Sequence, residues 1–288
     1  MRDYVILTDS CCDLTAQMAD ELGIVAIPLS LVMDDKEFRN HLDGRDISPK
    51  DFYARIRSGS MPTTSAINVG TFEEIMRPIL EGGKDILYLA FSSALSTTHQ
   101  SACIAAEGLR AEFPDAKIHV VDTLAASMGQ GLLMYLCAQQ QKSGKTVDEV
   151  RDYAENTKLN ICHWFTVDDL NHLKRGGRVS AATALLGTML AIKPVLHVDD
   201  GGHLISVSKA RGRKASLMAL ADEMGKTVTD AETIFISHGD CEEDVNLLAD
   251  ELRSRFGVKN VVINYVGPVI GAHTGAGVVA LFFVGSKR

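Results

Sequence analysis

The feature that most constrains the fold is an alternation of strand-like and helix-like segments through the first half of the chain. Short apolar runs at 4–8, 85–91 and 117–123 alternate with helical patterns at 13–23, 69–80, 96–113 and 125–144. Strands that are separated by helices pair in parallel through right-handed crossovers. We therefore predict an N-terminal α/β domain with a parallel, Rossmann-like sheet over residues 1–158.

The second half of the chain has a different pattern. Residues 193–210 form two extended runs around the sequence Asp-Asp-Gly-Gly, which is a strong signal for an antiparallel hairpin. Helical patterns at 213–225 and 243–257 separate further strand-like runs. These features predict a second α/β domain with a mixed or antiparallel sheet over 159–288, and a ligand site between the two domains.

Charge and composition exclude several classes of function. The net charge of −8 argues against a nucleic-acid-binding surface. Residues 266–285 lack Asp, Glu, Lys and Arg, but they contain five glycines and Pro268, so we predict a loop followed by a strand rather than a membrane span. The six cysteines form no C-x-x-C pair, which favours buried thiols in a cytoplasmic protein without a metal or cofactor.

Three clusters of hydroxyl residues stand out in this chain. They are the segments 91–102 (FSSALSTTHQSA), 61–72 (MPTTSAINVGTF) and 271–277 (GAHTGAG), the last of which places a histidine between glycines. Hydroxyls and helix N-termini donate hydrogen bonds to carboxylates and phosphates. Several hydroxyls without a recognisable base favour a site that holds an anion.

Ser93 has two further interpretations. It would act as a nucleophile of a small-molecule hydrolase or transferase if His99 or His273 served as its base, but the G-x-S-x-G elbow is absent. In the other interpretation the hydroxyls are solvated, and Ser96 or Thr97 caps the next helix.

A basic segment follows in the second half. Residues 173–180 (LKRGGRVS) place Lys174, Arg175 and Arg178 around two glycines. The spacing is not that of a P-loop. The cations either complement a helix C-terminus or dock an acidic partner or phosphate.

Taken together, these segments resemble the DegV family. The resemblance is carried by TDSCCDL, PTTS, FSSALSTTHQSA, VVDT, DDLNHLKRGGRVS, AIKPVLHVDDGGHLISVSKARGRKAS and GPVIGAHTGAG, which follow one another in the family's order. It implies a two-domain α/β protein that is not itself an enzyme. Such a protein encloses a long-chain fatty acid and presents its carboxylate to a separate fatty acid kinase subunit, which forms an acyl phosphate.

The resemblance also implies roles for particular residues. Thr64, Ser93 and His273 hold the carboxylate, and Ser65, Ser96 and Thr274 are their neighbours. Arg178 serves docking of the kinase, and Arg211 lies near the head group. The chain departs from the family's usual pattern at Ala94 and Thr97, where glycines are usual, and at Ala66 and Ile67, which replace Gln-Pro.

Overall fold

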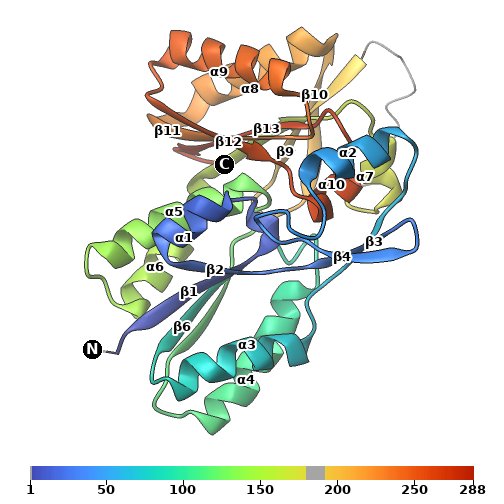
Figure 1. Ribbon diagram of the computed structural model, residues 1–288. Helices are drawn as coiled ribbons and strands as arrows, with labels where there is room; N and C mark the ends of the chain where they lie inside the picture. The colour runs from blue at the N-terminus through green and yellow to red at the C-terminus, as the bar shows by residue number, and fades with distance from the viewer. Residues whose placement is uncertain (1, 180–191) are drawn as a thin grey trace.

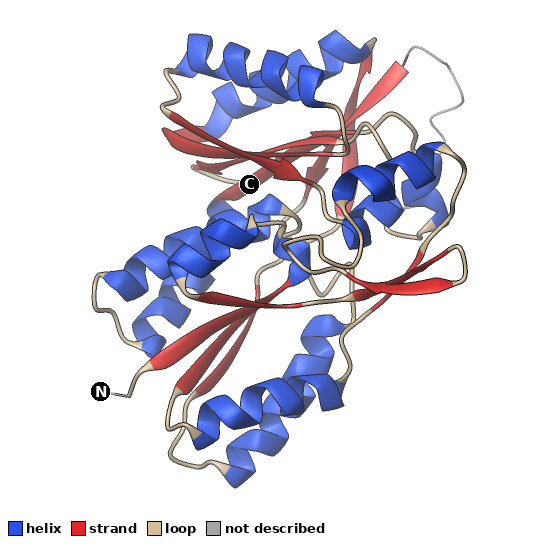
Figure 2. Cartoon of the chain, in the orientation of Figure 1, coloured by secondary structure: helices blue, strands red, loops and turns tan. Residues whose placement is uncertain are grey.

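Three β-sheets organise the chain in the computed structural model, which describes residues 2–179 and 192–288 (Figure 1, Figure 2). The four-stranded and six-stranded sheets belong to the two domains, and helices cover both of them. The predicted two-domain α/β class is therefore confirmed.

The sheet of the N-terminal domain is wholly parallel, as predicted. Its strands are, in spatial order, β2 (Ile24–Ile27), β1 (Tyr4–Asp9), β6 (Asp85–Ala90) and β7 (Ile118–Asp122). Every residue of β6 is buried, because helices lie against both faces of the sheet. The carboxyl ends of β1, β6 and β7 therefore open toward the same edge.

The helices of this domain form two layers (Figure 1). One layer consists of α1 (Ala16–Leu22), α5 (Met128–Lys142) and α6 (Val147–Thr157). The other consists of α3 (Val69–Glu81) and α4 (Thr98–Glu112). Their ends follow the sequence signals: Gly23 ends α1 in the left-handed conformation, and Thr146 forms a capping box with Glu149 at the start of α6.

A small antiparallel sheet was not predicted as a unit. It consists of β4 (Lys36–Arg39), β3 (Ser30–Met33) and β5 (Thr63–Ser65), and α2 (Pro49–Arg57) precedes β5 in the chain. The sequence Ser48-Pro49 is a typical helix start, and in the structure Ser48 caps α2 and Pro49 occupies its first position. The sheet matters for the site because β5 carries Thr64 and Ser65.

The sheet of the C-terminal domain is mixed, as predicted. Its strands are, in spatial order, β10 (Leu204–Arg211), β9 (Ile192–Val198), β8 (Ile161–Thr166), β13 (Val279–Gly285), β11 (Val228–His238) and β12 (Asn260–Tyr265). The predicted β9–β10 hairpin is present, and β11 and β12 form the parallel pair. Two helices, α8 (Arg213–Thr227) and α9 (Glu242–Phe256), cover one face.

Two short helices lie near the small sheet in Figure 1. They are α7 (Asn171–Arg175) and α10 (Pro268–Thr274). The prediction of a loop at the start of 266–285 was wrong, because Pro268 occupies the first turn of α10, where a missing N–H costs nothing. The sequence of 168–190 predicts broken helices around the glycine pair 176–177; α7 lies in the first part of this range, and its remainder from 180 lies outside the described residues.

Three glycines in and beside α10, namely Gly271 and the two capping residues Gly267 and Gly275, lie in close contact with their surroundings. A Cβ would lie 2.6 Å from Asp13 Oδ1 at Gly267, 2.7 Å from Phe52 Cε1 at Gly271 and 2.6 Å from a ring carbon of His172 at Gly275. Real Cβ atoms do not approach so closely, so α10 fits its place only with glycine at these positions.

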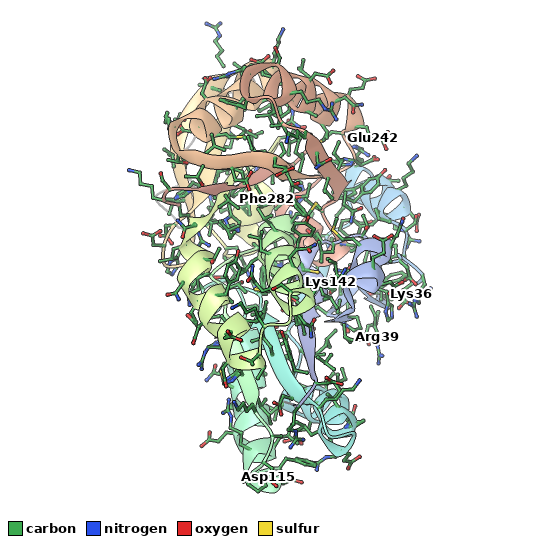
Figure 3. All side chains as sticks on the ribbon, turned by 90° about the vertical axis from the view of Figure 1, so that its left-hand side faces the viewer. Lys36, Arg39, Asp115, Lys142, Glu242 and Phe282 are labelled. Atoms are coloured by element: carbon green, nitrogen blue, oxygen red, sulfur yellow. The ribbon has the colours of Figure 1, made fainter. Side chains whose placement is uncertain are left out.

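The two domains share an apolar core. Helix α5 lies between the sheets, and one buried cluster includes Leu132 of α5, Phe235 of β11 and Phe282 of β13 (Figure 1). Phe282 lies inside the molecule, whereas Lys142 and Glu242 lie at its surface (Figure 3). Among the described residues, no helix is both long and apolar enough to cross a membrane.

Polar contacts also join the domains. Ser92 donates to the carbonyl of Gly202 in the β9–β10 turn at 3.0 Å. The Arg288 guanidinium donates to the carbonyls of Leu124 at 2.6 Å, Asp199 at 3.2 Å and Ile161 at 3.0 Å, and to that of Lys158. One side chain therefore links the β7–α5 loop, the hairpin and the start of β8.

Candidate functional site

A cavity of about 540 Å³ is lined by residues from both domains. Its volume lies in the range of small-molecule sites. Most of its wall is apolar and consists of Leu29, Phe91, Leu95, Phe165, Leu173, Val198, Leu204, Val266, Val269, Ile270, Val278, Ala280 and Phe282. The polar lining includes residues of all three predicted hydroxyl clusters, namely Thr64, Ser65, Ser93, Ser96, Thr97, His273 and Thr274.

A hydrogen bond between Thr64 and His273 joins two of these clusters. Thr64 Oγ1 lies 2.8 Å from His273 Nε2, although 209 residues separate them in the chain. Burial, together with the nearby cations Arg178 and Arg175, lowers the pKa of His273 to about 4. The imidazole is therefore neutral at pH 7. When its proton is on Nε2, His273 donates to Thr64 and leaves the hydroxyl hydrogen of Thr64 free for an anion.

Ser93 and Ser96 lie between the end of β6 and the start of α4. The backbone N–H of Ser93 donates to Asp122 Oδ1 at 3.2 Å, which fixes the loop, and Ser93 is exposed within the cavity lining. Ser96 Oγ accepts the N–H of Thr98 at 3.2 Å, so Ser96 supplies the predicted hydroxyl contact at the start of α4. Thr97, which occupies the N-cap position, forms no side-chain cap bond.

Ser65 and Thr274 have different surroundings. Ser65 ends β5 and is exposed. Thr274 is buried at the end of α10, and its hydroxyl donates to the Ile270 carbonyl one turn earlier at 3.2 Å. Ser65 can therefore donate to a ligand, whereas Thr274 has already used its only proton.

The Gly-Gly-Arg segment forms another part of the cavity wall. Arg178 lines the cavity, and its Nε donates to the Leu95 carbonyl in the Ser93 loop at 3.3 Å. Gly176 lies directly against the His273 ring, because a Cβ at Gly176 would be 2.2 Å from His273 Nδ1. Gly177 has a φ of +68°, which favours glycine. Glycine is therefore favoured at position 176 by the contact with the His273 ring and at position 177 by the backbone conformation.

Arg211 is the one predicted site residue that lies away from the cavity. It ends β10, is exposed, and does not belong to the cavity lining. The structure therefore does not bring Arg211 together with the other predicted head-group residues. Its neighbour Arg213 is more buried, pairs with Asp244 at 2.9 Å and donates to the Gly277 carbonyl at 2.6 Å.

Two polar cavity residues were missed by the sequence analysis. His163 of β8 donates from Nδ1 to the Ile161 carbonyl at 2.9 Å, and its Nε2 accepts the N–H of Ala126 at 3.4 Å. Burial lowers its pKa well below the usual value. Ser127 has a left-handed φ of 53° and donates to Asp13 Oδ2 at 2.5 Å. No motif surrounds either residue, so only the fold reveals them.

The arrangement lacks the geometry of a serine hydrolase. His273 Nε2 contacts Thr64, and His99 Nε2 lies 3.5 Å from Cys103 Sγ. Within residues 2–179 and 192–288, Ser93 Oγ forms no hydrogen bond with a histidine, and no group of His, Cys, Asp and Glu is arranged to hold a metal ion. The polar end can bind an anion without attacking it.

Comparisons with known proteins identify the family of this chain. A family model described as "Uncharacterised protein, DegV family" matches residues 3–286. A DegV domain-containing protein of Clostridium perfringens is 46% identical over 100% of this chain and 99% of its own length.

Two solved structures share the fold. A DegV lipid binding protein from Thermotoga maritima has a TM-score of 0.87 at 29% identity and covers 99% of both chains. A DegV family protein from Thermus thermophilus, described for its fatty acid binding, has a TM-score of 0.87 at 32% identity and covers 98% of this chain and 99% of its own. The family model, the sequence relative and the two structures all span nearly the whole chain, which therefore belongs to the DegV family.

Proposed function

We propose that this protein binds a long-chain fatty acid in the cavity between its domains and presents the carboxylate to a separate kinase subunit. The observation that carries the proposal is a cavity of about 540 Å³ with apolar walls and a polar cluster that includes the Thr64–His273 hydrogen bond. Fatty acid binding by the Thermus thermophilus relative supports the same ligand class.

The carboxylate is bound by neutral donors. Thr64, Ser65, Ser93 and Ser96 supply hydroxyl groups, and His273 fixes the orientation of Thr64. Arg178 adds a nearby positive charge. Thr274 lines the cavity, but its hydroxyl proton is already donated to the Ile270 carbonyl, so it shapes the site and does not donate to the carboxylate. Neutral donors bind a carboxylate without forming a buried ion pair, which leaves its oxygens free to react with a phosphoryl donor.

The apolar wall accounts for retention of the acyl chain. Burying ~14 methylene groups at roughly 0.8 kcal/mol each gives a gross gain of about 11 kcal/mol. Ordering of the chain and loss of its overall motion oppose this gain, so the net affinity is smaller. A ligand that survives purification is still expected.

Presentation to a kinase is the finer part of the proposal. Three cations, Lys174, Arg175 and Arg178, are exposed on or just after α7 beside the cavity. They favour a partner surface that carries negative charge. We also propose that the two domains meet at residues 158–159, which precede β8.

The test is extraction of lipid from the purified protein followed by mass spectrometry. A bound long-chain fatty acid, or stoichiometric uptake of added oleate, is expected. Ser93→Ala and His273→Ala should weaken oleate binding and leave the unfolding transition unchanged. A wild-type protein that contains no fatty acid and takes up neither oleate nor palmitate would refute the proposed function.

A further inference from the structure

A buried carboxylate lies at the start of α10, the helix that carries His273. Asp13 follows β1 and is only 3% exposed. Its Oδ1 accepts the backbone N–H of Gly267, the N-cap residue of α10, at 3.0 Å. A Cβ at Gly267 would lie 2.6 Å from the same oxygen, so the helix start and the carboxylate are in direct contact.

The same residue is bonded to both domains. Asp13 Oδ2 accepts from Ser127 Oγ at 2.5 Å, and Ser127 Oγ lies 2.8 Å from Ser237 Oγ of β11. The backbone carbonyl of Asp13 accepts from Asn264 Nδ2 at 2.8 Å. Asp13 itself has a φ of 51°, in the left-handed region. A short turn in the N-terminal domain is thus bonded directly to β12 and to the start of α10, and through Ser127 to β11.

The partners of this carboxylate are unusual because they are all neutral. Among the residues that the structure describes, Asp13 has donors but no cation within salt-bridge distance. A buried carboxylate without a cation is costly, and a purely stabilising contact needs no charge. An asparagine in its place would accept from Gly267 but would present an amide to Ser127. The carboxylate alone accepts from both at once.

We propose that Asp13 is a positioning residue of the anion site: by holding the start of α10 it sets where His273 lies relative to Thr64. The proposal rests on the proposed function, since the anion is taken to be a fatty acid carboxylate. Helix α10 is only seven residues long, so a shift at Gly267 is transmitted to His273 within two turns. Tyr53 provides a comparison, because its hydroxyl donates to the adjacent Val266 carbonyl at 2.7 Å.

Because Asp13 can ionise, its positioning role predicts that ligand binding depends on pH. Its pKa is raised to about 7, because burial and the nearby Asp9 outweigh the hydrogen bonds from Ser127 and Gly267, which lower it. The other titratable groups that face it are Cys11, Cys12 and Tyr53, and burial raises the pKa of each of them. The ionised carboxylate accepts stronger hydrogen bonds than the protonated one. The hold on Gly267 is therefore firmer at pH 8 than at pH 6.

The experiment compares wild type, Asp13→Asn and Tyr53→Phe as full-length proteins. Oleate affinity is measured at pH 6 and pH 8, and the imidazole nitrogen resonances of His273 are recorded without ligand. Wild type should bind more tightly at pH 8. Asp13→Asn should bind about tenfold more weakly at pH 8 and lose the pH dependence, with shifted His273 resonances. Tyr53→Phe removes a bond to the same segment but should keep the pH dependence.

Each outcome is decisive. Asp13→Asn with wild-type affinity, pH dependence and His273 resonances overturns the inference and leaves the proposed function standing. If Asp13→Asn does not fold, wild-type His273 resonances that stay unchanged between pH 6 and pH 8 overturn it instead. A wild type that binds no oleate overturns the proposed function, while the His273 resonances still report whether Asp13 positions the imidazole.

Discussion

Gly176 provides the sharpest test of the anion site, because one methyl group should displace His273. The backbone of Gly176 has a φ of −71° and a ψ of −11°, which any L-residue adopts. Gly176→Ala therefore adds no backbone strain. The new Cβ would lie 2.2 Å from His273 Nδ1, whereas ordinary contact begins near 3.4 Å, so the ring must retreat by roughly 1.2 Å.

That retreat breaks the hydrogen bond to Thr64. The present separation of 2.8 Å would approach 4 Å if Thr64 stayed in place on β5. A hydrogen bond that serves a charged ligand contributes about 1.5–3 kcal/mol. We therefore expect the dissociation constant for oleate to rise by about ten- to a hundredfold. Displacement of a fluorescent fatty acid measures it.

A matched glycine and a second variant complete the design. Gly108→Ala in α4 places its Cβ 4.0 Å from the nearest neighbour, Glu73 Oε1, and should leave binding unchanged. In a His273→Ala background, Gly176→Ala should have little further effect, because the displaced ring is gone. Equal losses with and without His273, or no loss in the single variant, would refute the reasoning.

Three further predictions follow from other contacts. Arg178→Ala should keep its oleate but slow phosphorylation by the kinase. Arg211→Ala, at an exposed position away from the cavity, is the control and should behave as wild type. Equal phosphorylation rates for wild type and both variants would contradict the docking role. Arg288→Ala loses contacts to four carbonyls and should lower the free energy of unfolding in urea by about 3 kcal/mol. An unchanged urea midpoint would contradict this prediction. The free energy of unfolding at pH 5 minus that at pH 7 should be larger for His273→Gln than for wild type. Urea midpoints of both proteins at the two pH values measure this difference. Between about pH 4 and 6.5 unfolded His273 binds more protons than the folded residue, so stability rises with pH, while Asp13, with its pKa raised to about 7, has the opposite slope.

Local sequence signals predicted most of the architecture. The serine and proline at 48–49 set the start of α2, and the Asp-Asp-Gly-Gly turn set the β9–β10 hairpin. These features depend on neighbours in the chain, so a single sequence contains them. The start of α10 was missed because glycine and proline are frequent in loops, although proline also fits a first helical turn.

The assembly of the site depends on contacts that no local pattern records. The two hydroxyl clusters at Thr64 and His273 were visible, but their 2.8 Å contact arises from packing of α10 against the small sheet. The contact of Gly176 with the His273 ring has the same origin. Arg211 shows the converse, because a motif residue faces solvent once the hairpin is formed. Contacts between residues that are distant in the sequence therefore determine which motif residues line the cavity.

The glycine face of α10 limits how this protein can change during evolution. Gly267, Gly271 and Gly275 contact three separate parts of the chain, so most substitutions there would demand a compensating change elsewhere. A lineage or a directed-evolution library that adapts to a different acyl chain is therefore expected to leave this helix intact. New preferences should instead accumulate in the apolar wall of the cavity, at positions such as Phe165 and Phe282, where size can vary while the carboxylate end stays the same.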